Sequence, residues 1–239
     1  MGVDFKAIIG HNLTAGDLPA LPNRLNSDAA PDLAQAVKLL ARAYNRLHEE
    51  THRPYPAAKE DDTCLYIEPR HGANLLAPPP PPPKLAFGEG WPMRQPTTLR
   101  LFSAEEMWSG GYPIEYFGPA DLRLDVHRHC CVFGIARWYT FLAEQDFQYA
   151  MRLTAYELGQ IIGSSRAVYV PDSTFLPASG RSVAWEGGDL DAVIAYLQEQ
   201  CGPPAPTIAT IEEGYDGHSR GDGYIIDDFA DLKRAKRGA

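Results

Sequence analysis

The stretch DLRLDVHRHCCVFG, residues 121–134, places two histidines and two cysteines within five consecutive positions. Its first half alternates apolar and polar residues, which is the pattern of a β-strand with one face toward a core. Because successive side chains of a strand point to opposite faces, His127, His129 and Cys131 would share one face of a single strand. The stretch therefore predicts one long strand whose polar face carries two imidazoles and a thiol.

A metal site is one interpretation of this face. Imidazoles two positions apart on a strand have Cα atoms roughly 6–7 Å apart, so both could bind one ion, with Cys131 as a third ligand. The matching function is a metal-dependent hydrolase that uses His127, His129 and Asp222 as catalytic residues. The other interpretation is a half-exposed strand with polar residues outward. We favour it because no second cluster of His, Cys or acidic residues follows at a recognisable spacing. We therefore expect no catalytic residue, no resident metal and no other cofactor.

Composition and charge narrow the class of partner. The chain of 239 residues is 44% hydrophobic and 22% charged, which is ordinary for a globular protein. Its formal net charge is −9, and an acidic surface repels the phosphates that nucleic-acid-binding proteins must neutralise. The same field attracts basic proteins. These properties favour a basic protein partner over DNA or RNA. The alternative, and the commoner case, is that the acidity serves only the solubility of the chain.

The sequence also predicts a cellular location. Residues 1–13 lack the long apolar run of a secretory signal, and no stretch approaches the ~20 apolar residues of a membrane helix. Four cysteines without a Cys-x-x-Cys pair are too few for a disulfide scaffold of this size. We expect a soluble cytoplasmic protein that does not contact a membrane.

Periodicity predicts an α+β fold in which helices pack on a mixed sheet. Expected helices end at Gly163 and Gly202, and a βαβ unit is expected in the second half of the chain. We predict one α+β domain over 1–239, with a Pro-rich loop excursion at 51–96 and a basic flexible tail at 232–239. The expected strands are 3–9, 63–70, 98–102, 121–134, 166–170, 207–211 and 223–229, and the expected helices are 32–50, 136–163 and 188–202.

Prolines occupy every position from 78 to 83. Proline fixes φ and has no amide hydrogen, so this run favours a polyproline II segment. We interpret it as a stiff surface spacer. The alternative is a scaffold that presents the run to an aromatic groove of another protein.

The C-terminal part of the chain is rich in acids with tyrosines between them. Carboxylates beside tyrosines suit a surface that pairs with Arg and Lys of another protein. The alternative is a solvated hairpin whose acids face water. The candidate partner-binding residues are Glu212, Glu213, Tyr215, Asp216, Asp222, Tyr224, Asp227 and Asp228.

Three stretches together, GVDFKAIIGHNL at 2–13, RAVYVPDS at 166–173 and GYIIDDF at 223–229, resemble an uncharacterised group of bacterial proteins. Some proteins of that kind resemble immunity partners of secreted toxins. The resemblance implies an intracellular binding protein and assigns no site residues. Together with the charge, it leads to the hypothesis of an immunity-type inhibitor that neutralises a basic toxin or effector domain by occlusion.

Overall fold

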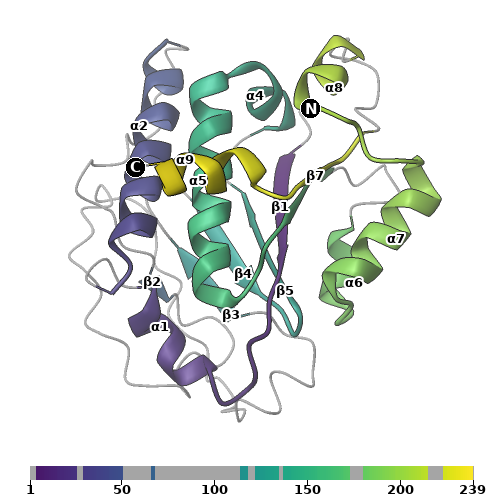
Figure 1. Ribbon diagram of the computed structural model, residues 1–239. Helices are drawn as coiled ribbons and strands as arrows, with labels where there is room; N and C mark the ends of the chain where they lie inside the picture. Colours follow the sequence, from purple (N-terminus) through teal and green to yellow (C-terminus); the bar gives the residue numbers. More distant parts are fainter. Residues whose placement is uncertain are drawn as a thin grey trace, which may run out of the picture.

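The computed structural model describes residues 4–25, 29–50, 66–67, 114–117, 122–134, 137–172, 180–214 and 223–238. Within these ranges, helices pack on a sheet of seven strands in the order β2-β3-β4-β5-β1-β6-β7 (Figure 1). The predicted α+β class is confirmed. Every strand pairing in the described part of the chain is antiparallel, so the mixed sheet is not observed there.

The strands and helices have the following bounds. The strands are β1 (Asp4–Gly10), β2 (Tyr66–Ile67), β3 (Ile114–Phe117), β4 (Arg123–Val126), β5 (Cys130–Gly134), β6 (Ala167–Asp172) and β7 (Ile225–Asp227). The helices are η1 (Leu18–Ala20), α1 (Leu21–Arg24), α2 (Pro31–Glu50), α4 (Trp138–Ala143), α5 (Gln145–Ile162), α6 (Arg181–Trp185), α7 (Leu190–Cys201), α8 (Ile208–Gly214) and α9 (Ala230–Gly238).

Strand β1 lies in the middle of the sheet and is buried on both faces. It pairs with β5 on one side and with β6 on the other, so Ala7 lies between Phe133 and Tyr169. Phe5, Ala7 and Ile9 belong to one core and Ile8 to the other. A strand that is buried on both faces needs apolar residues at successive positions, which explains the run from Ala7 to Ile9.

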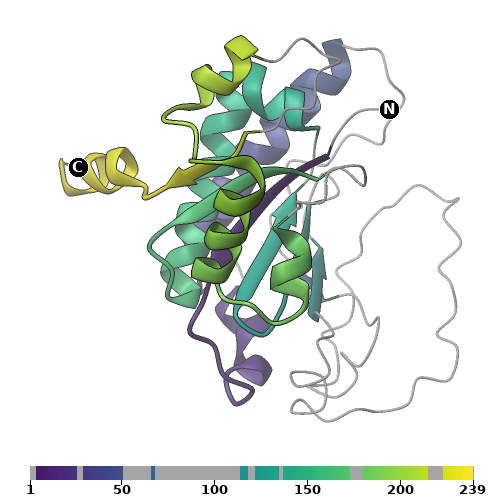
Figure 2. The ribbon, with the colours of Figure 1, turned by 90° about the vertical axis from the view of Figure 1, so that its right-hand side faces the viewer.

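Helices cover both faces of the sheet. On one face α2, α4 and α5 enclose the larger core, where the Phe5 ring stacks on Phe141 with 4.3 Å between ring centroids. On the other face α6 and α7 pack against Ile8, Val168 and Val170. Figures 1 and 2 show α2 and α5 on one side of β1 and the α6–α7 pair on the other. The sheet is thus the middle of three layers.

Two predicted helix boundaries follow from local chemistry. Helix α5 ends at Gly163, whose φ of 85° lies in the left-handed region that glycine adopts without strain. Helix α7 begins after Asp189, whose carboxylate accepts a hydrogen bond from the Ala192 amide. These observations confirm the helix ends expected from the sequence.

The segment predicted as a strand at 207–211 is part of helix α8, so the expected βαβ unit is not formed. The Thr207 hydroxyl accepts a hydrogen bond from the Thr210 amide and caps the first turn. Ile208 and Ile211, three positions apart, both pack toward the larger core. The apolar residues of this segment are thus spaced as on one face of a helix, and this helical spacing outweighed the alternating pattern that had suggested a strand.

The tail predicted to be flexible at 232–239 forms most of helix α9. Asp228 accepts a hydrogen bond from the Ala230 amide at the start of the helix. Leu232 is buried in the larger core. Of the predicted Pro-rich excursion at 51–96, only β2 lies within the described residues. The expected strand at 98–102 lies outside them.

We predict that Gly134→Ala destabilises the fold by about 2 kcal/mol or more, because a Cβ at this position would lie 2.3 Å from the Phe5 carbonyl oxygen in the neighbouring strand. Gly16→Ala is the matched control, since its Cβ would meet only the Thr14 hydroxyl at 3.6 Å, an ordinary contact. Urea unfolding of both variants measures the difference, and equal stabilities would contradict the packing of β1 on β5.

Candidate functional site

The sequence stretch at 121–134 forms two strands and a tight turn. The His127 amide donates a hydrogen bond to the Cys130 carbonyl with an N–O distance of 2.8 Å, and Val126 pairs with Cys131. Arg128 and His129 form the turn between β4 and β5. The prediction of one continuous strand is therefore wrong.

The turn reverses the assignment of side chains to faces. In an antiparallel pair, residues directly opposite one another point to the same face of the sheet. Val126 and Cys131 thus belong to the larger core, whereas His127 and Cys130 face α6 and α7. His127 and Cys131 lie on opposite faces, while His129 is exposed in the turn.

This geometry corrects the alternative metal set of His127, His129 and Cys131, because two of its members are separated by the sheet itself. Across the described ranges, no group of three His, Cys, Asp or Glu side chains could hold a metal ion. The alternative catalytic set combined His127 and His129 with Asp222, and Asp222 lies outside the described residues.

His127 and Cys130 form a packing surface for the α6–α7 pair. The His127 ring lies 5.1 Å from the Trp185 ring between centroids and is buried. The Cys130 thiol donates a hydrogen bond to the Gly188 carbonyl in the turn before α7, with an S–O distance of 3.5 Å. Trp185 itself remains 41% exposed. The hairpin therefore supports a helix pair.

His11 is a buried residue that the sequence did not single out. Its Nε2 lies 2.8 Å from the His127 carbonyl oxygen, and its Nδ1 accepts a hydrogen bond from the Leu13 amide at 3.1 Å. Its own amide donates to the His129 carbonyl. Since Nδ1 accepts, we infer a neutral ring with the hydrogen on Nε2. His11 thus attaches the end of β1 to the hairpin. In the sequence, only its position directly after an apolar strand could have pointed to this role.

Burial sets the protonation of this region. It lowers the pKa of His11 from 6.5 to about 4, helped by the nearby His129 and opposed by the bond to the His127 carbonyl. It raises the pKa of the Cys130 thiol to about 12, with the Asp189 charge adding to the shift. It also raises the pKa of Cys131 well above its ordinary value. Both cysteines therefore remain thiols at neutral pH and are weak nucleophiles.

The candidate partner-binding residues do not form one surface. Glu212 and Asp228 are exposed, whereas Tyr224 is buried and its hydroxyl donates to the Gly202 carbonyl at 3.2 Å. Asp227 is buried in an ion pair. The backbone of Glu213 lies in α8, its side chain is not described, and Tyr215, Asp216 and Asp222 lie outside the described residues.

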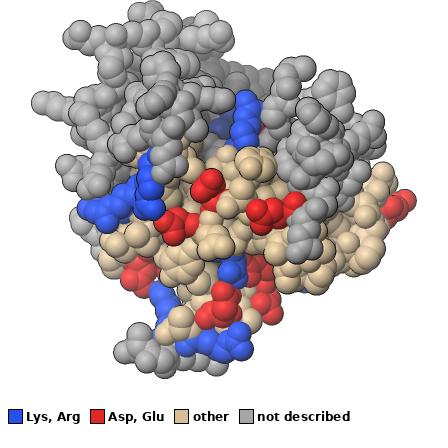
Figure 3. Space-filling view, turned by 90° about the horizontal axis from the view of Figure 1, so that it is seen from above, with Lys and Arg blue, Asp and Glu red and all other residues tan. Residues whose placement is uncertain are grey.

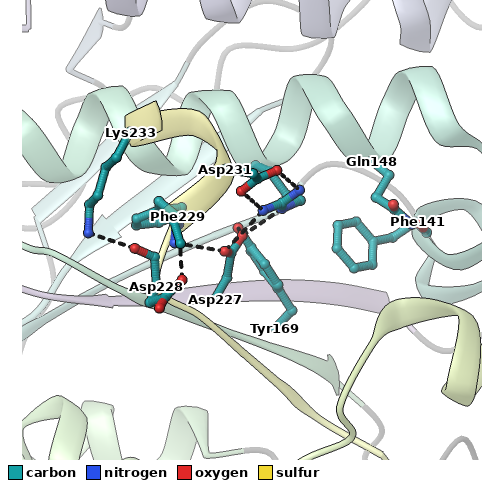
Figure 4. Close-up of polar contacts among 10 residues, drawn as sticks. Phe141, Gln148, Tyr169, Asp227, Asp228, Phe229, Asp231 and Lys233 are labelled. Carbon is teal, nitrogen blue, oxygen red and sulfur yellow. Dashed lines mark hydrogen bonds and ion pairs between the residues drawn. The ribbon is translucent and has the colours of Figure 1, made fainter. Parts of the chain in front are cut away.

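Asp227 belongs to a network that ties β7 and α9 to α5 (Figure 4). Arg152 donates from Nε to Asp227 at 2.7 Å and from its terminal nitrogen to Asp231 at 2.7 Å. The Tyr169 hydroxyl donates to Asp227 at 3.1 Å. Burial opposes the charge of Arg152, but the bonds to the two carboxylates raise its pKa. Arg152 and Asp227 are 75 positions apart in the chain, so no local pattern in the sequence predicts this pair.

Asp227 also holds the turn between β7 and α9. Phe229 has a φ of 59°, which a bulky residue adopts only at some energetic cost. Its amide donates to Asp227 Oδ1 at 2.9 Å, and its ring is fully buried. These contacts offset the backbone strain, so Asp227 acts as a structural residue and not as a free carboxylate for a partner.

Comparison with protein-family models, curated proteins and solved structures finds no match. None of the helices in the described part of the chain is both long enough and apolar enough to cross a membrane.

We predict that His11 makes the free energy of unfolding depend on pH between about 4 and 6.5. The folded state holds this imidazole neutral, so the unfolded state binds more protons in that window and stability rises with pH. Loss of the full effect on acidification amounts to about 3 kcal/mol. Urea unfolding from pH 7 to 4.5 measures this slope.

His11→Asn should flatten the slope, whereas His129→Asn, at an exposed turn position, removes only a minor cause of the His11 shift and should keep most of the slope. The same pH dependence in His11→Asn and in the wild-type chain would show that His11 is not the titrating group.

We further predict that Cys130 and Cys131 react with a maleimide only as fast as the protein unfolds, because both thiols are buried and protonated. Cys201, which is partly exposed, serves as the internal control and should react in the native state. Mass spectrometry of the labelled peptides assigns each site. Fast labelling of Cys131 at neutral pH would show that its thiol is accessible in the native state and contradict this prediction.

Proposed function

We propose that this chain is a binding protein of the immunity type, which neutralises a basic toxin or effector domain by covering it. The observation that supports this most directly is the acidic balance of the chain, which has 31 Asp and Glu against 22 Lys and Arg. Many lysines and arginines of the described ranges pair with carboxylates of the same chain: Lys6, Arg46, Arg123, Arg137, Arg152, Arg166 and Lys236.

Acidic side chains remain outside these pairs. Glu144, Glu186, Glu199 and Glu212 are exposed and have no ion-pair partner among the described residues. In the described ranges, Arg128 and Arg234 are also exposed and outside ion pairs. Figure 3 shows acidic side chains among uncharged ones in the middle of the upper face. Since the whole chain carries a net charge of −9, its outer field attracts cations and raises the association rate of a basic partner.

The hairpin residues that suggested a hydrolase support this choice indirectly. His127 and Cys130 contact α6 and the turn before α7, and the ring nitrogens of His11 hold the end of β1 to the hairpin. We accordingly assign these residues to the fold. Binding by surface complementarity is then the function that the described residues support best.

The direct test uses the tagged full chain to capture the products of adjacent genes. We expect one basic protein to bind, its activity to be inhibited at an equimolar ratio, and its association rate to fall as salt increases. If no adjacent-gene product binds, or if the bound protein keeps its activity, the proposal is wrong.

We predict that Glu212→Lys slows association with that partner several-fold at low salt, because it reverses one exposed charge of the C-terminal acidic region. Stopped-flow or surface-based kinetics measures the rate. Glu199→Lys is the matched control, since it changes the net charge equally on α7. Equal slowing by both variants would assign the effect to net charge and not to the region around Glu212.

A further inference from the structure

Helix α9 lies outside the layer formed by α2 and α5 and crosses both of them (Figures 1 and 2). Its sequence, ADLKRAKRG, carries four basic residues and one acid within nine positions. The residues below it belong to α2 and α5, whose sequences lie about 80 to 200 positions earlier in the chain. A basic helix is therefore bound on the outside of the fold by elements distant in sequence.

Lys236 is the central contact of this helix. Its ammonium lies 2.7 Å from the carboxylate of Asp32 at the start of α2 and 2.8 Å from Glu157 of α5. It also lies 5.6 Å from the centroid of the Tyr156 ring, within the range of a cation–π interaction. We call Asp32, Tyr156 and Glu157 the basic-helix seat. The seat thus combines an exposed carboxylate, an aromatic ring and a buried carboxylate.

The rest of α9 is held at its first turn. Asp231 pairs with Arg152, and Leu232 is buried beside the fully buried Phe229. Lys233 donates to the Ser165 carbonyl at 3.0 Å. Apolar anchoring therefore ends at Leu232, and the later turns of α9 are attached through the Lys233 and Lys236 ammonium groups.

Burial of Glu157 makes the seat selective for cations. A buried carboxylate that loses its partner is destabilising, so Glu157 favours a positive charge beside it as long as it stays covered. An ion pair between exposed groups, such as that of Lys236 with Asp32, contributes little. Exchange of one basic side chain for another preserves the pair with Glu157. A basic side chain of another helix in the place of Lys236 would make the same contacts with the seat.

We infer that the basic-helix seat is the docking site for a basic helix of the partner protein, and that α9 is its resident occupant until the partner displaces it. The basic character of the partner rests on the proposed function. The chemistry of the seat specifies the occupant further: a helix with a lysine or arginine placed as Lys236 is, able to reach both carboxylates and the Tyr156 ring at once. Phe229 and Leu232 keep the start of α9 in place during the exchange.

Hydrogen exchange of the full chain tests whether α9 is displaceable. Lys236→Ala should accelerate amide exchange in α9 about tenfold, because it removes the cation from Glu157. Raising the salt concentration should act in the same direction. Arg234→Ala is the matched control, since Arg234 is exposed on the same helix and has no ion pair with the described residues. Exchange in β1 and β6 should stay unchanged in every case.

A labelled synthetic peptide with the sequence of residues 229–239 tests the seat itself. It should bind the full-length Lys236→Ala chain saturably in fluorescence anisotropy. The same peptide with glutamate in place of both Lys233 and Lys236 should not bind. The additional change Asp32→Asn, at an exposed position, should weaken binding of the basic peptide.

Three results would overturn the inference. The first is α9 exchange that does not respond to Lys236→Ala, or that changes only together with β1 and β6. The second is absence of peptide binding. The third is protection of α9 that rises with protein concentration alongside dimer formation, which would make a second copy of the chain the occupant. Because the peptide test needs no partner, its failure is distinct from failure to capture an adjacent-gene product.

Discussion

Burial of β1 on both faces is the constraint on which the rest of the structure depends. A strand in the middle of a sheet leaves none of its backbone edges to water, and its side chains need cover on both sides. The partners of β1 come from β5 and β6, 120 or more positions later in the chain. Phe5 stacks on Phe141 on one side, and Ile8 packs beneath α7 on the other. Because β1 must be covered on both faces, helices lie on both sides of the sheet. Charged side chains can then be exposed on the outer surfaces of these helix layers and at the edges of the sheet.

The same arrangement decides what the polar residues can do. The end of β1 carries His11, which holds the hairpin between β4 and β5 and keeps its own ring neutral. At the outer edge of the sheet, Arg152 lies between two carboxylates and connects β7 with α9. Charged groups in both regions are satisfied within the chain. The chain as a whole carries an excess of carboxylates, which is the physical basis of the proposed attraction to a basic protein.

Much of the fold was predictable, and the errors have specific physical causes. The apolar run of β1, the amphipathic pattern of α2, and the ends of α5 at Gly163 and α7 at Gly202 depend on neighbouring residues alone. The turn at Arg128 and His129 was missed because it contains no glycine, proline or asparagine to interrupt the alternation. Of the candidate site, Glu212 and Asp228 are exposed, which fits a partner surface and acids that face water equally. The burial of Tyr224 and the pairing of Asp227 depend on Gly202 and Arg152, which no local pattern connects to them.

The sequence by itself determined the α+β class, the strands β1, β6 and β7, the helices α2, α5 and α7, and the net negative charge, because each depends on composition or on contacts within a few residues. The tertiary structure alone decided which face each hairpin residue occupies, which carboxylates form ion pairs within the chain, and where α9 binds. These outcomes depend on pairs such as Lys236 with Asp32, which are 204 positions apart. Only the folded chain brings such residues together, because a local pattern in the sequence does not predict contacts between residues that are far apart in the chain.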